Sequence, residues 1–146
     1  MYRGVIIYAP AEPVIQRLVR RLADCFDGER FKVATCSADQ AAIPDLTAAD
    51  IFLLASLPSG GQPIHPDFGE ILRAFGGITL AGRVGGVFSL DSEVTLKAFR
   101  RALQDCELDF PEQNFRNFHG GDIDSAELGG WIAALTGQLE DPALER

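Results

Sequence analysis

The fold is decided by the stretch Asp50-Ile51-Phe52-Leu53-Leu54-Ala55-Ser56-Leu57-Pro58-Ser59-Gly60-Gly61. Residues 51–55 form the most apolar strand-like run in the chain, and a short continuous run of this kind favours a strand buried on both faces. The prolines and glycines that follow, as far as Pro66, predict a loop by their turn chemistry. This loop is longer than a simple joint between a strand and a helix needs. A strand so placed belongs near the centre of a parallel sheet.

Strand and helix patterns alternate on both sides of this stretch. Further strands are predicted at 4–8, 31–36 and 84–90, with a short or broken fifth strand within 108–118. Apolar residues at helical spacing predict helices that begin at Pro13 and end at Asp27 and Gly28, and helices around 68–75, 96–103 and 128–139, whereas 37–49 is predicted as a short connection. Such alternation implies parallel pairing with helices on both faces, which is the doubly wound α/β class.

Length and composition favour one soluble domain. The 146 residues are 47% hydrophobic and 23% charged, which excludes collagenous, coiled-coil and disordered chains, and we expect a single domain over 1–146. No apolar run is long enough for a membrane helix or a signal peptide, so a cytoplasmic protein with no membrane contact is expected.

The charge and the cysteines argue against nucleic-acid binding, a disulfide framework and a metal site. The net charge of −8 disfavours nucleic acid as a partner. It is explained by solubility alone, and the charged partner that it would suit is a basic protein surface. The three cysteines include no close pair and the two histidines are far apart, so neither a disulfide framework nor a metal site is expected.

Ligands of doubly wound sheets lie beyond the carboxyl ends of the strands, which directs attention to loops 9–12, 56–66 and 91–92. A dinucleotide site needs glycines directly after the first strand, and residues 8–13 contain none. A P-loop is absent from the sequence. A phospho-acceptor receiver domain would need an aspartate at the end of the third strand, where Ala55 and Ser56 stand.

The chain resembles the flavodoxin family over nearly its whole length. The resemblance is carried by 52–61, by Phe68-Gly69-Glu70-Ile71-Leu72, by 80–92 with Phe99 beyond it, and by 124–139 with Trp131. It implies a three-layer sandwich around a five-stranded parallel sheet of order 2-1-3-4-5. It also implies FMN, with the flavin ring between the loops that follow the third and fourth strands. The cofactor-binding candidates in those loops are Ser56, Ser59, Gly60, Gly61, Ser89 and Asp91.

The loop after the first strand departs from the family pattern. Flavodoxins hold the FMN phosphate in a loop rich in Ser and Thr, where this chain has Ala9, Pro10, Ala11, Glu12 and Pro13. None of these side chains carries a hydroxyl, two are prolines without a backbone donor, and Glu12 adds negative charge at a helix N-terminus that would otherwise attract the phosphate. We therefore expect weak or no FMN binding.

The resemblance and the altered loop leave two main functions for this chain, and a third is kept open. The first is a non-catalytic flavodoxin-like domain with a protein-interaction, sensing or structural role. The second is a working FMN protein that carries single electrons to or from a basic redox partner. An enzyme acting on another small ligand has no recognisable Ser-His-Asp pattern, although His65 or His119 could approach a serine in space. Gly60 and Gly61 could be turn residues alone, Asp91 could belong to a helix N-cap region, and His65 or Phe68 could replace a stacking aromatic residue.

Overall fold

The computed structural model describes residues 1–78, 80–104, 106, 110–120 and 122–140. In these residues five strands and five α-helices alternate, with two short 3₁₀ helices. The strands are β1 (Tyr2–Ala9), β2 (Phe31–Ser37), β3 (Ile51–Ser56), β4 (Val84–Leu90) and β5 (Phe115–Phe118). The helices are α1 (Pro13–Asp24), α2 (Ile43–Thr47), α3 (Gly69–Ala74), α4 (Glu93–Leu103) and α5 (Ser125–Glu140), and the 3₁₀ helices are η1 (Pro66–Phe68) and η2 (Glu112–Asn114).

The strands form one parallel sheet of order β2-β1-β3-β4-β5, so the predicted doubly wound fold and strand order are confirmed. All six residues of β3 are buried, as its continuous apolar pattern predicts. Its neighbours are β1, where Gly4 pairs with Ile51, and β4, where Val84 pairs with Ile51. The deciding stretch of sequence therefore forms the central strand.

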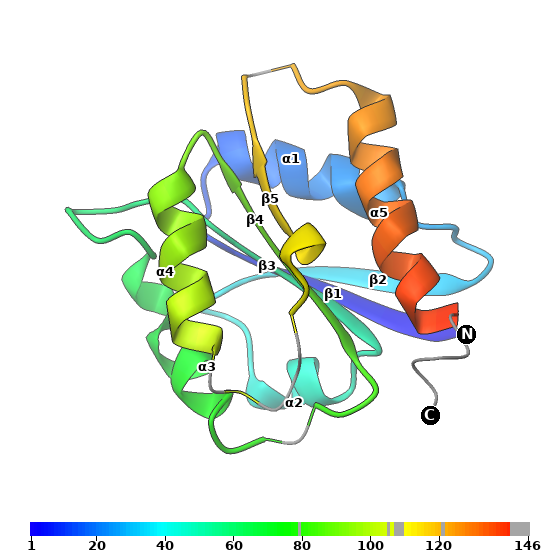
Figure 1. The fold of residues 1–146 in the computed structure, drawn as a ribbon, viewed down its shortest axis with the longest axis horizontal. Coiled ribbons are helices and arrows are strands. Elements are labelled where there is room, and N and C mark those ends of the chain that lie inside the picture. Colours follow the sequence, from blue (N-terminus) through cyan, green and yellow to red (C-terminus); the bar gives the residue numbers. More distant parts are fainter. Residues whose placement is uncertain (79, 105, 107–109, 121, 141–146) are drawn as a thin grey trace.

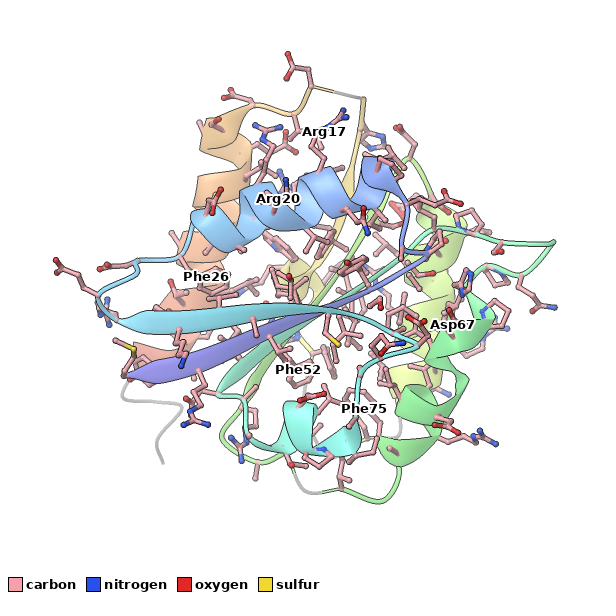
Figure 2. The ribbon with its side chains drawn as sticks, turned by 180° about the vertical axis from the view of Figure 1, so that it is seen from behind. Arg17, Arg20, Phe26, Phe52, Asp67 and Phe75 are labelled. Carbon is pink, nitrogen blue, oxygen red and sulfur yellow. The ribbon has the colours of Figure 1, made fainter. Side chains whose placement is uncertain are left out.

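Helices cover both faces of the sheet (Figure 1). Helices α1 and α5 enclose one core, in which Leu53 packs with Trp131, and α2, α3 and α4 enclose the other. Phe52 and Phe75 meet in this second core with ring centroids 5.6 Å apart, on the α2 side of the sheet in Figure 2. Side chains of β3 alternate between the two cores, which gives the three layers.

Two consecutive glycines in β4 let both cores approach the sheet closely. A Cβ at Gly85 would lie 2.5 Å from the Phe110 ring and 2.7 Å from that of Phe52. A Cβ at Gly86, on the other face, would lie 2.7 Å from Leu53. The glycine pair in this strand pattern thus marks a close approach of side chains to the backbone.

The structure corrects one sequence-based element, the connection before β3, and confirms that the fifth strand is short. The segment predicted as a short connection contains the single turn α2, which begins where the Ala42 N–H donates to the Asp45 carboxylate at 2.7 Å. One turn offers too few apolar positions for helical periodicity to be visible. Within the range predicted for the fifth strand, η2 precedes a strand of four residues, and residues 108 and 109 lie outside the described part of the chain. No helix in the described ranges is both long and apolar enough to cross a bilayer.

Candidate functional site

The loops at the carboxyl edge of the sheet are tied to one another by hydrogen bonds. The Leu57 N–H donates to the Ala9 carbonyl at 3.0 Å, which joins the loops after β3 and β1. The Thr95 hydroxyl donates to the Pro63 carbonyl at 2.6 Å, which joins the β3 loop to the start of α4. The Ser92 N–H donates to the side chain of Asn117 in β5 at 2.9 Å. The predicted site residues are therefore carried by one connected edge.

The loop from β1 to α1 presents a carboxylate at the helix N-terminus. Glu12 is the N-cap residue of α1, in an extended conformation, and its side chain accepts no hydrogen bond from the first turn. Pro13 follows at the start of the helix and has no N–H to donate. Ala11, Glu12 and Pro13 are all exposed. A phosphate placed here would meet a carboxylate and no side-chain hydroxyl of the loop, so these residues do not fit the phosphate of FMN.

Ser56 and Ser89 are brought together at the ends of β3 and β4, with both residues fully buried. The Ser89 hydroxyl donates to the Ser56 carbonyl at 2.8 Å. The Ser56 hydroxyl donates to the Leu57 carbonyl at 2.9 Å and accepts from the His65 N–H at 2.9 Å. Both hydroxyls thus hold the β3 loop in place, and their contact with a cofactor stays a prediction.

Ser59, Gly60 and Gly61 lie in a tight turn at the tip of the β3 loop. Ser59 and Gln62 exchange two backbone hydrogen bonds of 2.9 and 2.8 Å, and the glycines between them have φ of +54° and +81°. Two consecutive residues with positive φ are typical of a two-residue hairpin turn and favour glycine. A Cβ at either glycine would meet no atom within 4 Å. The turn accounts for both glycines, and a ligand contact there stays a prediction.

Asp91 follows β4 with a φ of +50° and is exposed. The N-cap of α4 is Ser92, whose hydroxyl accepts from the Thr95 N–H, so Asp91 stands immediately before the cap. One Asp91 carboxylate oxygen lies 3.3 Å from His119 Nδ1 and accepts from the Gly120 N–H at 3.3 Å. Sequence reasoning left His119 without a partner. The pairing of Leu90 with Phe118 in the parallel register, once the strand order is known, would have placed the two following residues side by side.

Two residues were candidates to stack against a flavin ring, Phe68 and His65, and they lie in different environments. Phe68 is fully buried and contacts Phe99 edge to face, with ring centroids 5.4 Å apart, so it is a core residue. His65 is partly buried, and its Nδ1 accepts from the Asp67 N–H at 3.1 Å. No Phe, Tyr or Trp occurs in the β3 loop from Ser56 to His65 or in the β4 loop at 91–92.

The thiols of Cys25 and Cys36 are shifted away from the reactive thiolate form. Burial raises the pKa of Cys25, an effect that Arg21 opposes and Asp24 reinforces. Burial also raises the pKa of Cys36, with Asp45 and Asp39 adding to the shift. In the described part of the chain, no group of three or more His, Cys, Asp or Glu residues is arranged to hold a metal ion.

Comparisons with known proteins find structural similarity alone. No protein-family model matches the chain, and no curated protein matches it in sequence. A short-chain flavodoxin associated with a non-canonical PDU bacterial microcompartment superposes with a TM-score of 0.81 at 15% identity, covering 95% of this chain and 99% of the other. Flavodoxin 1 of Bacillus cereus gives 0.76 at 16% identity, covering 92% and 97%.

A flavodoxin of Fusobacterium nucleatum bound to flavin mononucleotide gives a TM-score of 0.69 at 11% identity, covering 94% of this chain and 99% of the other. Each similarity extends over nearly the full length of both chains, in agreement with the strand order and the two helical layers. The chain is therefore a flavodoxin-like domain in its fold.

Proposed function

We propose that this chain is a flavodoxin-like domain with a degenerate phosphate-binding loop and a non-catalytic role in protein interaction, sensing or structure. The observation that carries the proposal is Glu12 at the N-cap of α1, followed by Pro13. Hydrogen bonds to a charged group contribute roughly 1.5–3 kcal/mol each, and a phosphate at this loop would lack several of them. The Glu12 carboxylate adds repulsion close to the helix end. Together these terms are large enough to remove tight FMN binding.

The alternative is an FMN-binding flavodoxin that carries single electrons to a redox partner. It is favoured by the similarity to the flavodoxin of Fusobacterium nucleatum whose structure holds flavin mononucleotide. The two proposals differ in what the phosphate contributes. A working loop makes FMN bind far more tightly than riboflavin, whereas a repelling loop makes FMN bind no better than riboflavin.

Parallel titrations with FMN and riboflavin, followed by flavin fluorescence, separate the two. We expect no preference for FMN in the unaltered chain. The double change Pro10→Thr and Glu12→Asn should introduce a preference for FMN of about tenfold or more, because it supplies two hydrogen-bonding side chains and removes one charge. Glu29→Gln is the matched control, since it removes one exposed negative charge at the opposite edge of the sheet. A preference for FMN in the unaltered chain would establish the alternative.

The partner we propose for the carboxyl edge is a basic protein surface. Exposed carboxylates follow several strands at this edge, and they include Glu12, Asp67, Asp91 and Glu93. In a chain of net charge −8 they would steer a basic partner toward this edge. Association through them should weaken as the salt concentration rises, which a binding titration against ionic strength would detect.

A further inference from the structure

Among the described residues, no strand pairs with the outer edge of β2. Its other edge pairs with β1 through a ladder of backbone hydrogen bonds. At one end of the ladder the Tyr2 N–H donates to the Arg30 carbonyl, and at the other end the Ala38 N–H donates to the Tyr8 carbonyl, each at 2.8 Å. In a parallel ladder alternate residues of a strand bond to the same neighbour. The even-numbered residues of β2 therefore face β1, and the backbone N–H and C=O groups of Val33 and Thr35 point away from the sheet. In Figure 2 this strand crosses the front of the molecule, with α1 above it and α2 below.

This edge carries little protection against pairing with another strand. Native edge strands are blocked by charged side chains, prolines or bulges. Strand β2 has the sequence Phe-Lys-Val-Ala-Thr-Cys-Ser, with one charge near its beginning and no proline. Its middle residues Ala34 and Thr35 are uncharged and exposed. An added strand would therefore meet no charge along the second half of β2.

A polar groove of about 330 Å³ lies on the α1 side of this strand, lined by Tyr8, Gln16, Val19, Arg20, Ala23 and Thr35. The described residues that line it supply one guanidinium group, two hydroxyls and an amide, and no carboxylate. Within the described residues the Arg20 guanidinium forms no hydrogen bond or ion pair. In a chain of net charge −8, this groove is suited to a negative group.

A second groove, of about 300 Å³, lies on the α2 side of β1 and β2. Its lining is mainly small and apolar, with Val33, Ala34, Pro44 and Ala48 among the contributors, and its charged residues are Arg3, Lys32 and Asp45. Side chains of an extended strand point alternately to the two faces of its sheet. A strand added to β2 would therefore direct every second side chain toward the polar groove and the others toward the apolar one.

We propose that the β2 edge binds an extended segment of a partner protein in which carboxylate residues alternate with small apolar ones. The segment forms a sixth strand, with its backbone bonded to Val33 and Thr35 and a carboxylate facing Arg20. A second copy of this chain does not fit as well, because its own β2 contains no carboxylate. The inference rests on the interaction role proposed above but not on the absence of FMN, so the peptide test and the flavin titrations can fail separately.

The test uses a fluorescein-labelled nine-residue peptide in which Val alternates with Glu and Thr, and fluorescence anisotropy with the full chain. Saturable binding is expected, together with binding at least about tenfold weaker for the same peptide with Lys in place of Glu. Amide hydrogen exchange should show slower exchange at Val33 and Thr35 when the Glu peptide is bound. Absence of binding, equal binding of both peptides, or unchanged exchange at those amides would overturn the proposal.

Three variants locate the site. Arg20→Glu should weaken binding of the Glu peptide about tenfold or more. Arg101→Glu makes the same charge reversal at an exposed residue of α4 and should change the affinity less than about twofold. Thr35→Pro should abolish binding, because proline removes an outward donor while edge strands tolerate it. An equal effect of the two arginine changes would contradict the proposal. So would a dimer of the unaltered chain in sedimentation analysis that Thr35→Pro disrupts, since the edge would then bind a second copy.

Discussion

At the residue scale, Gly86 shows how tightly the core is built around β4. An added Cβ there would lie 2.7 Å from Leu53, 3.2 Å from Leu135 and 3.4 Å from Trp131. All three neighbours are buried, so a methyl group can be accommodated only by moving side chains that are already packed. The absence of a side chain at this position is therefore part of the packing.

Gly86→Ala should lower the free energy of unfolding by about 1–3 kcal/mol, because overpacking forces side chains or backbone to shift. Gly130→Ala is the matched control, since Gly130 is exposed in α5 and an added Cβ meets nothing within 4 Å. It should raise the free energy of unfolding by roughly 0.5–1 kcal/mol through helix propensity. Urea unfolding of both variants measures this, and a loss of the same size in both would contradict the packing argument.

The cysteines give a second prediction at this scale. Burial raises the pKa of Cys25 and of Cys36, so the thiolate, which is the reactive form, is scarcer at a given pH than in an exposed thiol. Alkylation of both by iodoacetamide, followed by peptide mass spectrometry, should be slower than that of a cysteine in a short peptide at pH 7.5. The rate should keep rising as the pH passes the ordinary thiol pKa, and a plateau below that pKa would show the opposite shift.

At the element scale, the two helices that begin at the candidate site start differently. In α4 the Ser92 hydroxyl accepts from the Thr95 N–H and lies 2.8 Å from the Thr95 hydroxyl. In α1 the Glu12 side chain makes no capping bond. The first helix therefore begins without the stabilisation that a short hydroxyl or amide side chain supplies.

Substitutions at the two N-cap positions, Ser92 and Glu12, should change stability in opposite directions. Ser92→Ala should lower the free energy of unfolding by about 0.5–2 kcal/mol, and Glu12→Ser should raise it by up to about 1 kcal/mol. Thermal and urea unfolding at 0.2 M salt, where charge effects are partly screened, would measure both. A gain from Ser92→Ala or a loss from Glu12→Ser would show that the helix ends are stabilised by other contacts.

The elements that sequence patterns predict are those with enough residues to show a period. The buried run of β3 and the apolar stripe of α1, with Ile15, Leu18 and Leu22 buried, are both visible in the sequence. Helix α2 has a single turn and one buried side chain, Leu46, so no period could reveal it. The close pair of Asp91 and His119 depends on strand register, which local sequence does not contain.

At the scale of the whole molecule, the flavodoxin-like fold brings together an acidic carboxyl edge and an outer β2 edge beside Arg20, whose guanidinium has no hydrogen-bond or ion-pair partner among the described residues. The sequence pattern predicts the class and the loops that line the carboxyl edge, and the resemblance to flavodoxins implies the strand order. It does not predict the grooves beside β2, because their walls come from α1, α2 and two strands that meet only in the folded chain. Cofactor binding by Ser56, Ser59, Gly60, Gly61, Ser89 and Asp91 stays a prediction.

The most direct measurement is a thermal melt of the purified full chain with increasing FMN, combined with its visible absorbance. A ligand that binds only the folded state stabilises it by about 2.7 kcal/mol at one hundred times its Kd, which would raise the Tm by several degrees. The Glu12 and Pro13 helix start predicts a colourless protein whose Tm stays constant up to millimolar FMN. A yellow protein, or a Tm that rises with FMN concentration, would contradict the claim that the loop after β1 cannot support FMN binding, and would identify a working flavin site.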